Sequence, residues 1–413
     1  MPAESLELAS TQCCIAGGGP AGIMAGLLLA RAGVDVLVLE KHADFFRDFR
    51  GDTIHPSTLE LMHELGYDQD LLRLPHQEVR ELAFHVGARE FKIADFSHLG
   101  VSHPFIALMP QWDFLNFLAV KGACYPGFRL RMNAEVTGLT ERDGRIAGVH
   151  VNTSEGDLEV RADLVLGADG RHSIVREKAG LEVDEIGAPI DVLWFRLSRP
   201  SDDPEETMAR LGAGNFMVML NRGDYWQCAF VIAKGDAEKI KQRGLFAFRR
   251  DIVELAPFVK DRVEELNDWD QQIKLLAVAI DRLYKWYRPG LLCIGDCAHA
   301  MSPVGGVGIN LAIQDAVAAA NILAAPLREG RVNLDHLRAA QERREWPAKI
   351  TQAVQVQVQN RILRPILSGR GEPKPPLFVE LLDRIPFLRR LPAYAAGIGA
   401  RPEHIRTPEF ASL

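Results

Sequence analysis

The strongest structural signal in this chain is the stretch CCIAGGGPAGIMAGLLLARAGVDVLVLE, residues 13–40. It begins with a short apolar run, passes through GGGPAG, continues with the helical pattern IMAGLLLARAG and ends in VDVLVLE. This order predicts a strand, a glycine turn, a helix and a second strand within about thirty residues. Such a βαβ unit is typical of an α/β domain whose first turn binds a dinucleotide.

The three spaced glycines, Gly17, Gly19 and Gly22, have separate expected roles. The first makes the tight turn, the second lets a pyrophosphate approach the backbone, and the third lets helix and strand pack closely. The helix that follows offers free N–H groups and partial positive charge to the phosphates. Glu40 lies 18 residues after Gly22, where an acid accepts hydrogen bonds from ribose hydroxyls. Because an acid at this place disfavours a ribose 2′-phosphate, we expect an NAD-like or FAD-like nucleotide.

The bulk composition excludes several classes of protein. The 413 residues allow two or three domains at about 150 residues each, and 47% hydrophobic residues can fill a large core. The net charge of −7 argues against nucleic acid as a main partner, because phosphate binding needs a basic surface. The opening MPAESLELAST has no basic cluster, and no apolar run reaches about 20 residues. We therefore expect neither a signal peptide nor a transmembrane helix.

The cysteines indicate the compartment. Six are scattered along the chain without paired C-x-x-C spacing, at positions 13, 14, 124, 228, 293 and 297. This pattern fits buried reduced thiols in a cytoplasmic protein and neither a disulfide framework nor a zinc site. We expect no metal site in the chain.

A second turn, GADGRHSIVR at residues 167–176, follows the apolar strand DLVL. Asp169 could hold a ribose or shape the turn, and Ser173 could cap the next helix. Taken alone, this stretch is better explained by an ordinary Asp-Gly turn before a capped helix.

A third turn lies in LLCIGDCAHAMSPVGGVGINLAIQDA, residues 291–316, which runs from an apolar strand into a helical pattern. An acid, Asp296, a histidine, His299, and a loop with three glycines lie between the two elements. Taken alone, this stretch indicates only an acid and a loop with small side chains at a strand-to-helix crossing.

The rest of the chain predicts an antiparallel sheet and peripheral helices. Residues 187–280 are mostly of period two with a helical interval, and residues 80–107 also alternate like strands. Residues 57–66 predict a helix with Ser57 as its N-cap. The segment FVELLDRIPFLRRL, residues 378–391, predicts an amphipathic helix. Docking on the body of the protein is its simplest interpretation, with a membrane surface or a second subunit as the alternative.

The three turns in this order resemble the FAD-dependent group A aromatic hydroxylases, the p-hydroxybenzoate hydroxylase-like flavoprotein monooxygenases. The resemblance covers about residues 1–360 and rests on the three motifs together. It implies an α/β fold in which a Rossmann-type, GR2-like FAD-binding domain is interleaved with an antiparallel-sheet substrate domain and followed by C-terminal helices. The implied ranges are FAD-binding parts at 1–79, 108–186 and 281–360, substrate parts at 80–107 and 187–280, and a helical tail at 361–413.

The resemblance also implies which residues contact FAD. Those expected along its ADP half and its middle are glycines, acids, a loop arginine and a helix glutamine: Gly17, Gly19, Gly22, Glu40, Arg50, Gln111, Asp169 and Asp296. Those expected to present backbone N–H groups to the pyrimidine edge of the isoalloxazine are Gly308, Ile309 and Asn310. The loop expected beside the reactive ring contains Pro303, Gly305, Gly306 and Gly308.

Some positions fit the family less closely. Arg50 is equally well explained as a solvated loop arginine. Phe114 stands where the family usually has leucine, and Cys297 where it usually has alanine. His299 fits a hydrogen-bonded structural residue better than a catalyst. The sequence indicates no catalytic base.

The implied activity is hydroxylation of an aromatic ring, phenolic or polyketide-like, by O2 with FAD as cofactor and NADPH or NADH as co-substrate. In the family, NAD(P)H docks transiently, and a flavin C4a-hydroperoxide transfers the hydroxyl group. Candidate substrate contacts lie on the strands of the antiparallel part: Trp194, Arg196, Phe216, Met217, Met219, Tyr225, Trp226 and Gln227. Only half of each strand can face a pocket.

Three alternatives share the fold. A flavin-dependent halogenase normally carries a WxWxIP signature, and this sequence has none. A flavin-dependent reductase or dehydrogenase would reduce a double bond without consuming oxygen. A non-enzymatic FAD-binding protein would have lost the glycine loop at residues 305–310, which is intact here. The partners we expect are therefore a small aromatic molecule and O2; an oligomer is compatible with the sequence.

Overall fold

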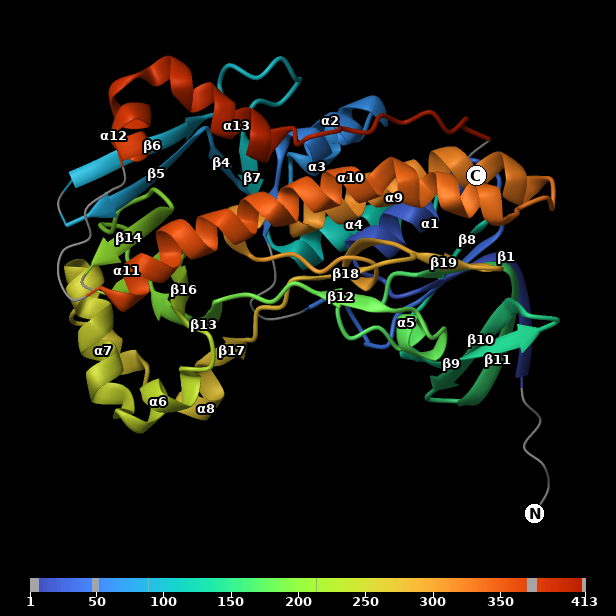
Figure 1. Cartoon of the computed structure of the whole chain (residues 1–413), viewed down its shortest axis with the longest axis horizontal. Coiled ribbons are helices and arrows are strands. Elements are labelled where there is room, and N and C mark those ends of the chain that lie inside the picture. The colour runs from blue at the N-terminus through green and yellow to red at the C-terminus, as the bar shows by residue number, and fades with distance from the viewer. Residues whose placement is uncertain (1–6, 47–51, 88, 213, 370–376, 411–413) are drawn as a thin grey trace.

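The computed structural model describes residues 7–46, 52–87, 89–212, 214–369 and 377–410. Two large sheets occupy opposite ends of the molecule, and the long helix α10 (Leu334–Val358) extends from one toward the other (Figure 1). The mixed α/β class expected from the sequence is confirmed.

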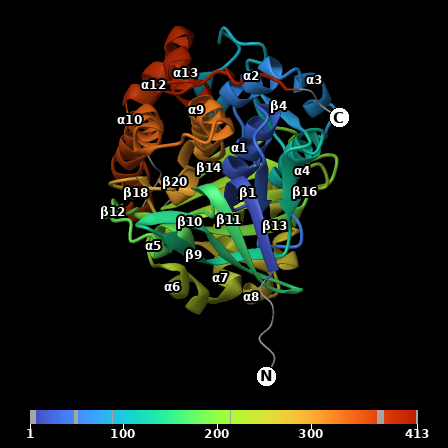
Figure 2. The same ribbon diagram turned by 90° about the vertical axis from the view of Figure 1, so that its right-hand side faces the viewer.

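The first sheet contains the βαβ unit. Its order is β19 (Tyr287–Arg288), β20 (Leu291–Cys293), β11 (Gly156–Gly167), β1 (Glu7–Ala16), β2 (Val36–Leu39) and β8 (Phe128–Arg131), with β9 (Ala134–Arg142) and β10 (Arg145–Thr153) attached to β11. β1 pairs in parallel with both β2 and β11, and β11 in parallel with β20. Helix α1 (Pro20–Arg31) connects β1 to β2, as the glycine pattern predicts. Figure 2 shows β1 beside β11, with α1 above them.

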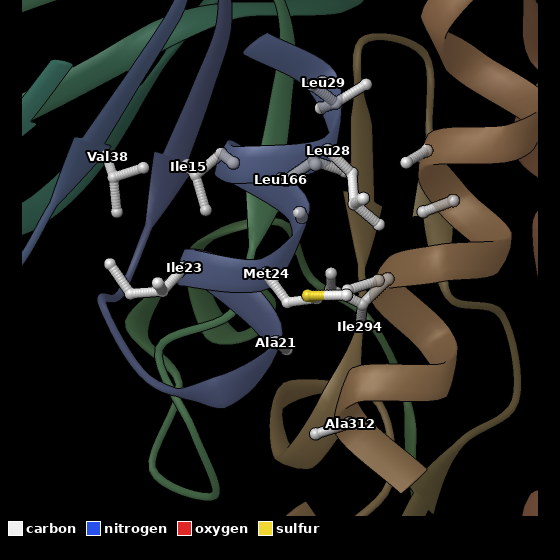
Figure 3. Packing of buried hydrophobic residues seen from close by; sticks show 14 of the residues in the cluster. Ile15, Ala21, Ile23, Met24, Leu28, Leu29, Val38, Leu166, Ile294 and Ala312 are labelled. Atoms are coloured by element: carbon white, nitrogen blue, oxygen red, sulfur yellow. The ribbon is translucent and has the colours of Figure 1, made fainter. Parts of the chain in front are cut away.

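Helix α1 lies at the centre of the first core. It packs between the strands that carry Ile15 and Val38 and the long helix α9 (Gly308–Arg328), as Figure 3 shows. Met24 of α1 lies against Ile294, and both side chains are buried. Because α1 has neighbours on several sides, its apolar residues are not confined to one stripe.

The segment Val304–Arg328, which contains α9, is long and apolar enough to span a membrane, although the sequence predicts no such helix. Of the most apolar 18 residues in this segment, 72% are buried inside the protein. The apolar composition is therefore accounted for by packing against α1 and α10 (Leu334–Val358).

The second sheet joins two distant parts of the chain. Its order is β17 (Lys274–Leu276), β13 (Ile190–Ser198), β16 (Tyr225–Ala233), β15 (Asn215–Asn221), β14 (Met208–Gly212), β5 (Glu81–Val86) and β6 (Arg89–Asp95). The predicted antiparallel strands with a helical interval are present between residues 190 and 276. The interval contains α6 (Ala237–Gln242), α7 (Gly244–Leu255), η1 (Pro257–Val259), η2 (Val263–Glu265) and α8 (Trp269–Gln272). Phe248 of α7 packs edge-on against Phe195 and Phe230, which closes the outer face of the sheet.

Smaller elements connect the two sheets. They are β3 (Thr53–Ile54), α2 (Pro56–Glu64), α3 (Asp68–Leu71), β4 (Gln77–Val79), β7 (Ile106–Leu108), α4 (Gln111–Gly122), α5 (Ile174–Lys178), β12 (Val183–Glu185), β18 (Asp281–Leu283), η3 (Gly295–Cys297) and η4 (Val304–Gly306). The prediction that Ser57 caps α2 is wrong. The helix begins at Pro56, and its N-cap is His55, two residues before Ser57. Proline suits this first helical position because its missing N–H would have no partner there.

The C-terminal part continues from α10 through η5 (Gln359–Leu363) and α11 (Arg364–Ser368). Beyond it are α12 (Leu377–Arg384), η6 (Pro386–Arg389) and α13 (Arg390–Gly397). Helices α12 and α13 lie against β6 (Figure 1), with Val379 and Ala393 buried. The last described residue, Phe410, lies beside α1, where its N–H donates to the Arg31 carbonyl at 2.9 Å. The segment predicted as one amphipathic helix, residues 378–391, is instead divided among α12, η6 and the start of α13. Its apolar residues Phe378, Leu381, Ile385 and Leu391 are exposed, so the body of the protein covers the segment only in part.

Candidate functional site

Of the three spaced glycines in the first turn, Gly17 and Gly22 are packed and Gly19 is open. Gly17 has φ +104°, and a Cβ there would lie 2.4 Å from the Ala168 carbonyl oxygen. A Cβ on Gly22 would lie 1.9 Å from the Gly17 carbonyl oxygen. A Cβ on Gly19 would meet no atom within 4 Å. Packing therefore accounts for Gly17 and Gly22, whereas Gly19 borders open space at the start of α1.

The start of α1 is suited to an anion. Gly19 is the N-cap, no side chain caps it, and Pro20 occupies the first turn. The first N–H groups of a helix have no acceptor within it, and the helix dipole places partial positive charge there. The open space beside Gly19 and these donors together form a cradle for phosphate.

Glu40 ties the end of β2 to this turn. Its Oε2 accepts a hydrogen bond from the Gly18 N–H at 2.9 Å, and its Oε1 accepts one from the His42 N–H at 3.1 Å. The side chain is buried. Two backbone donors thus fix the carboxylate beside the glycine turn.

The second and third turns leave the same edge of the first sheet. The register places Ala16 beside Gly167, and Gly167 beside Cys293, so the turns after β1, β11 and β20 are neighbours. Arg171 Nη2 lies 3.4 Å from Asp296 Oδ2 and links the second turn to the third. The carboxyl ends of parallel strands are the usual ligand-binding edge of such a sheet.

Of the two carboxylate oxygens of Asp169, only Oδ2 accepts a hydrogen bond from a residue that the structure describes. Its Oδ2 accepts from the Val175 N–H at 3.1 Å, and Ser173 Oγ accepts from the Arg176 N–H at 2.9 Å. The predicted cap by Ser173 is confirmed. Asp169 Oδ1 is buried and has no hydrogen-bond partner among the residues that the structure describes. A buried carboxylate oxygen is costly without a donor, so this atom points to a hydroxyl or N–H supplied by a ligand.

The loop before α9 is held by Asn310. Asn310 Oδ1 accepts from the His55 N–H at 2.9 Å and from Thr58 Oγ1 at 2.8 Å, while its Nδ2 donates to the Thr53 carbonyl at 3.1 Å. Thr53 Oγ1 in turn donates to the Gly306 carbonyl at 2.7 Å. The side chain of Asn310 is thus fully engaged in fixing the helix start.

The backbone at the start of α9 remains available. The helix begins at Gly308 without a side-chain cap, so the N–H groups of Gly308, Ile309 and Asn310 have no acceptor within the helix. Gly305 and Gly306 have φ of +81° and +63°, which glycine adopts without strain. Pro303 is exposed beside them. The loop therefore presents backbone and little side chain.

His299 belongs to a buried charge network. Its Nε2 lies 2.6 Å from Asp315 Oδ2, which also accepts from the Gly295 N–H at 3.0 Å. Asp315 Oδ1 accepts from Arg344 Nε at 2.9 Å, and Arg344 reaches Glu403 at 3.3 Å. Although burial raises the pKa of Asp315, His299 and Arg344 outweigh it and lower this pKa below its usual value. The geometry agrees with a structural His299 that helps to hold the third turn.

A second buried network was not predicted from the sequence. Arg222, between β15 and β16, donates to Asp52 Oδ2, and Gln227 Nε2 donates to the same oxygen at 3.0 Å. Asp52 Oδ1 accepts from the Gln111 N–H at 3.2 Å, which places the predicted glutamine beside this pair. Burial raises the pKa of Asp52, and Arg222 and Gln227 oppose that rise. These contacts join the second sheet to the segment before α4.

The two faces of the second sheet divide the candidate substrate residues. Met217, Met219 and Trp226 are buried in the core beneath α7. Trp194 and Phe216 lie on the opposite face, in a cluster that also contains Val304 of the loop before α9. Arg196, Tyr225 and Gln227 lie on that same face by alternation. Arg50 lies outside the residues that the structure describes.

Comparison with known proteins adds three findings. Residues 10–354 match the family model described as an FAD binding domain. The 6-methylpretetramide 4-monooxygenase of Streptomyces rimosus is 32% identical over 363 residues, which cover 88% of this chain and 86% of the relative. The dialkyldecalin synthase of Streptomyces rugosporus is 27% identical over 325 residues, which cover 73% of this chain and 63% of that protein.

A solved structure has the same fold. The p-nitrophenol 4-monooxygenase of Pseudomonas putida superposes with a TM-score of 0.77 at 20% identity, over 96% of this chain and 100% of that one.

Proposed function

The chain belongs to the family of FAD-binding group A flavoprotein monooxygenases, and on this premise we propose that it hydroxylates an aromatic or polyketide-like ring with NAD(P)H and O2. Bound FAD supplies the electron transfer and the activation of oxygen, while the protein binds, orients and encloses the reactants. The observation that carries the proposal is that three turns meet at one sheet edge. There, Gly19 borders open space, and the buried Asp169 Oδ1 has no partner among the described residues.

The proposed FAD contacts follow these turns. The start of α1, with Gly17, Gly19 and Gly22, receives the pyrophosphate, and Glu40 receives a ribose of the ADP half. Asp169 supplies an acceptor through its free Oδ1. The polar groups fit the cofactor because each supplies what FAD requires: donors for phosphate and acceptors for hydroxyls.

Two further contact sets complete the cofactor site. Asp296 lies in the third turn and Gln111 begins α4, and we propose that both bind the middle of the cofactor. The N–H groups of Gly308, Ile309 and Asn310 stabilise negative charge at the pyrimidine edge of the flavin. Because Asn310 fixes the helix start through its side chain, these donors need no reorganisation during reduction.

We also propose the interleaved domain boundaries that the sequence predicts, with substrate parts at 80–107 and 187–280. Their support is the second sheet, in which β5 and β14 pair in parallel although more than one hundred residues separate them. The substrate then lies on the face with Trp194 and Phe216, opposite Val304. An aromatic and aliphatic wall there would exclude water from the oxygenation step.

The deciding experiment measures cofactor, electron donor and product together. The purified protein should carry flavin absorbance, and a phenolic or polycyclic substrate should stimulate both NAD(P)H oxidation and O2 consumption. The product should gain one oxygen atom, with 18O from labelled O2. Absence of flavin binding under all conditions would refute the proposal. NAD(P)H oxidation with a hydrogenated product and no O2 uptake would assign a reductase instead.

The relative named dialkyldecalin synthase favours one other candidate function. A chain of this family could use the same fold to bind and shape a substrate without oxidising it. The product would then have the same mass as the substrate, and neither NAD(P)H nor O2 would be consumed. Mass spectrometry of the same reactions separates the two functions.

A further inference from the structure

A cluster of two histidines and an aspartate lies apart from the residues assigned to FAD. His63 belongs to α2, Asp68 is the first residue of α3, and His103 lies between β6 and β7. His63 Nδ1 and His103 Nε2 both lie 2.9 Å from Asp68 Oδ2. The three atoms lie within 4.8 Å of one another. Three segments of the chain thus direct one potential ligand atom each to a common point.

We propose that His63, Asp68 and His103 bind one divalent transition-metal ion, Zn²⁺ by preference, and that this ion fastens the segment before β7 to the α2–α3 turn. The proposal departs from our expectation, based on the scattered cysteines, that the chain has no metal site. Two imidazole nitrogens and one carboxylate oxygen form a donor set that Zn²⁺ accepts, with solvent as the fourth ligand.

The two distances that involve Asp68 are close to those around a small tetrahedral ion. Ligand atoms about 2.1 Å from a tetrahedral centre are about 3.4 Å from one another. The two 2.9 Å contacts to Asp68 Oδ2 therefore need to open by only about half an ångström, which is within the reach of side-chain rotation. A larger ion with six or more oxygen ligands would find too few oxygens here.

The three ligand side chains are buried to different extents, and the most exposed one marks the side from which an ion can enter. The side chain of Asp68 is 8% exposed and that of His103 15%, whereas that of His63 is 53% exposed. The ion would thus enter beside His63, where solvent also provides the remaining ligand. Asp68 would stay fixed below it.

Neighbouring groups hold the ligands in place. The ring of His103 lies edge-on to Phe105 at 5.9 Å, and Phe105 stacks on His76 at 6.4 Å. Glu60 Oε2 accepts from the Ser102 N–H at 2.8 Å, so the segment that carries His103 is tied to α2 a second time. Such supporting contacts orient ligands before an ion arrives and raise its affinity.

The first test measures the binding of Zn²⁺ to the full-length, FAD-loaded protein after a chelator has removed bound metal. Calorimetric titration with ZnCl2 should show one equivalent of Zn²⁺ per chain. Co²⁺ as a probe should develop the visible absorption of a tetrahedral nitrogen and oxygen site, and Zn²⁺ should displace it. A wild-type protein without saturable Zn²⁺ binding, or with the spectrum of hexahydrated Co²⁺, would overturn the proposal.

Variants locate the ion. His63→Ala combined with His103→Ala should weaken Zn²⁺ binding by at least about 100-fold. His98→Ala is the matched control, because His98 lies on the same segment and pairs only with Asp95 in the described structure, at 3.4 Å. Unchanged affinity in the double variant would refute the assignment. If the double variant fails to fold, Asp68→Asn, which keeps the shape of the side chain, should lose Co²⁺ absorption by itself; its retention would be equally decisive.

Discussion

Substitution of two glycines in the first turn separates cofactor binding from packing. Gly19→Ala adds a methyl group where the structure has nothing within 4 Å, at φ −72° and ψ −175°, which alanine adopts freely. Alanine loses less entropy on folding than glycine by about 0.4–1 kcal/mol, but it is a poorer N-cap by a similar amount. The free energy of unfolding of the apoprotein should therefore change by less than about 1 kcal/mol.

The same methyl group should interfere with FAD. It occupies the side from which a phosphate approaches the first N–H groups of α1. A hydrogen bond to a charged group contributes about 1.5–3 kcal/mol, and the loss of one corresponds to about 10–100-fold weaker binding. The affinity for FAD is measured by the quenching of flavin fluorescence when FAD is titrated with the apoprotein. Affinity equal to that of the wild type would refute the proposed path of the pyrophosphate.

Gly22→Ala provides the contrasting variant. Its Cβ would lie 1.9 Å from the Gly17 carbonyl oxygen, so α1 and the turn must separate by about 1.5 Å to reach ordinary contact. Overpacking of this size costs about 3 kcal/mol or more. Urea unfolding of the apoprotein should show the loss without FAD being present. If the Gly22→Ala apoprotein were as stable as the Gly19→Ala apoprotein, the packing argument would be wrong.

Three further predictions concern buried charges. Asp315→Asn leaves Arg344 with a weaker buried partner and should lower the free energy of unfolding by about 3 kcal/mol in urea; a midpoint equal to that of the wild type would contradict this. Burial lowers the pKa of His55 to about 4, so stability should fall as pH drops from about 6.5 to 4, because only the unfolded histidine takes up a proton. That loss is about 3 kcal/mol, and His55→Gln should remove it; an equally steep profile in the variant would assign the loss to other groups. Arg222→Met should destabilise the protein by about 3 kcal/mol by isolating the Asp52 carboxylate, and much less in an Asp52→Asn background; equal losses in both would rule out the pair as the cause.

The sequence predicts those features whose signals are local. The β1–α1–β2 unit is confirmed, because the spacing of the glycines specifies the turn between strand and helix. The cap at Ser173 is also confirmed, because its hydroxyl lies three residues before the N–H that it accepts from. The N-cap of α2 was misplaced by two residues, since Pro56 fixes the helix start more strongly than a nearby serine.

Features formed by distant segments could not be read in this way. Asp52 and Arg222 are 170 positions apart, and each stands in a polar loop that predicts only solvation. Alternation in β13 and β16 identifies two faces of the sheet but not which one contacts α7. That choice depends on where the helical interval folds back, which is a property of the whole sheet.

The fold explains why acids and glycines from three distant turns can serve one cofactor. β1, β11 and β20 are parallel neighbours, so their carboxyl ends must meet at one edge. The third turn is also connected to α9, because Asp315 accepts the Gly295 N–H two turns after the helix begins. A shift of the helix start would therefore break a buried hydrogen bond at the strand end. Because His299 holds the same carboxylate, it would support the proposed cofactor site by positioning the third turn rather than by transferring a proton.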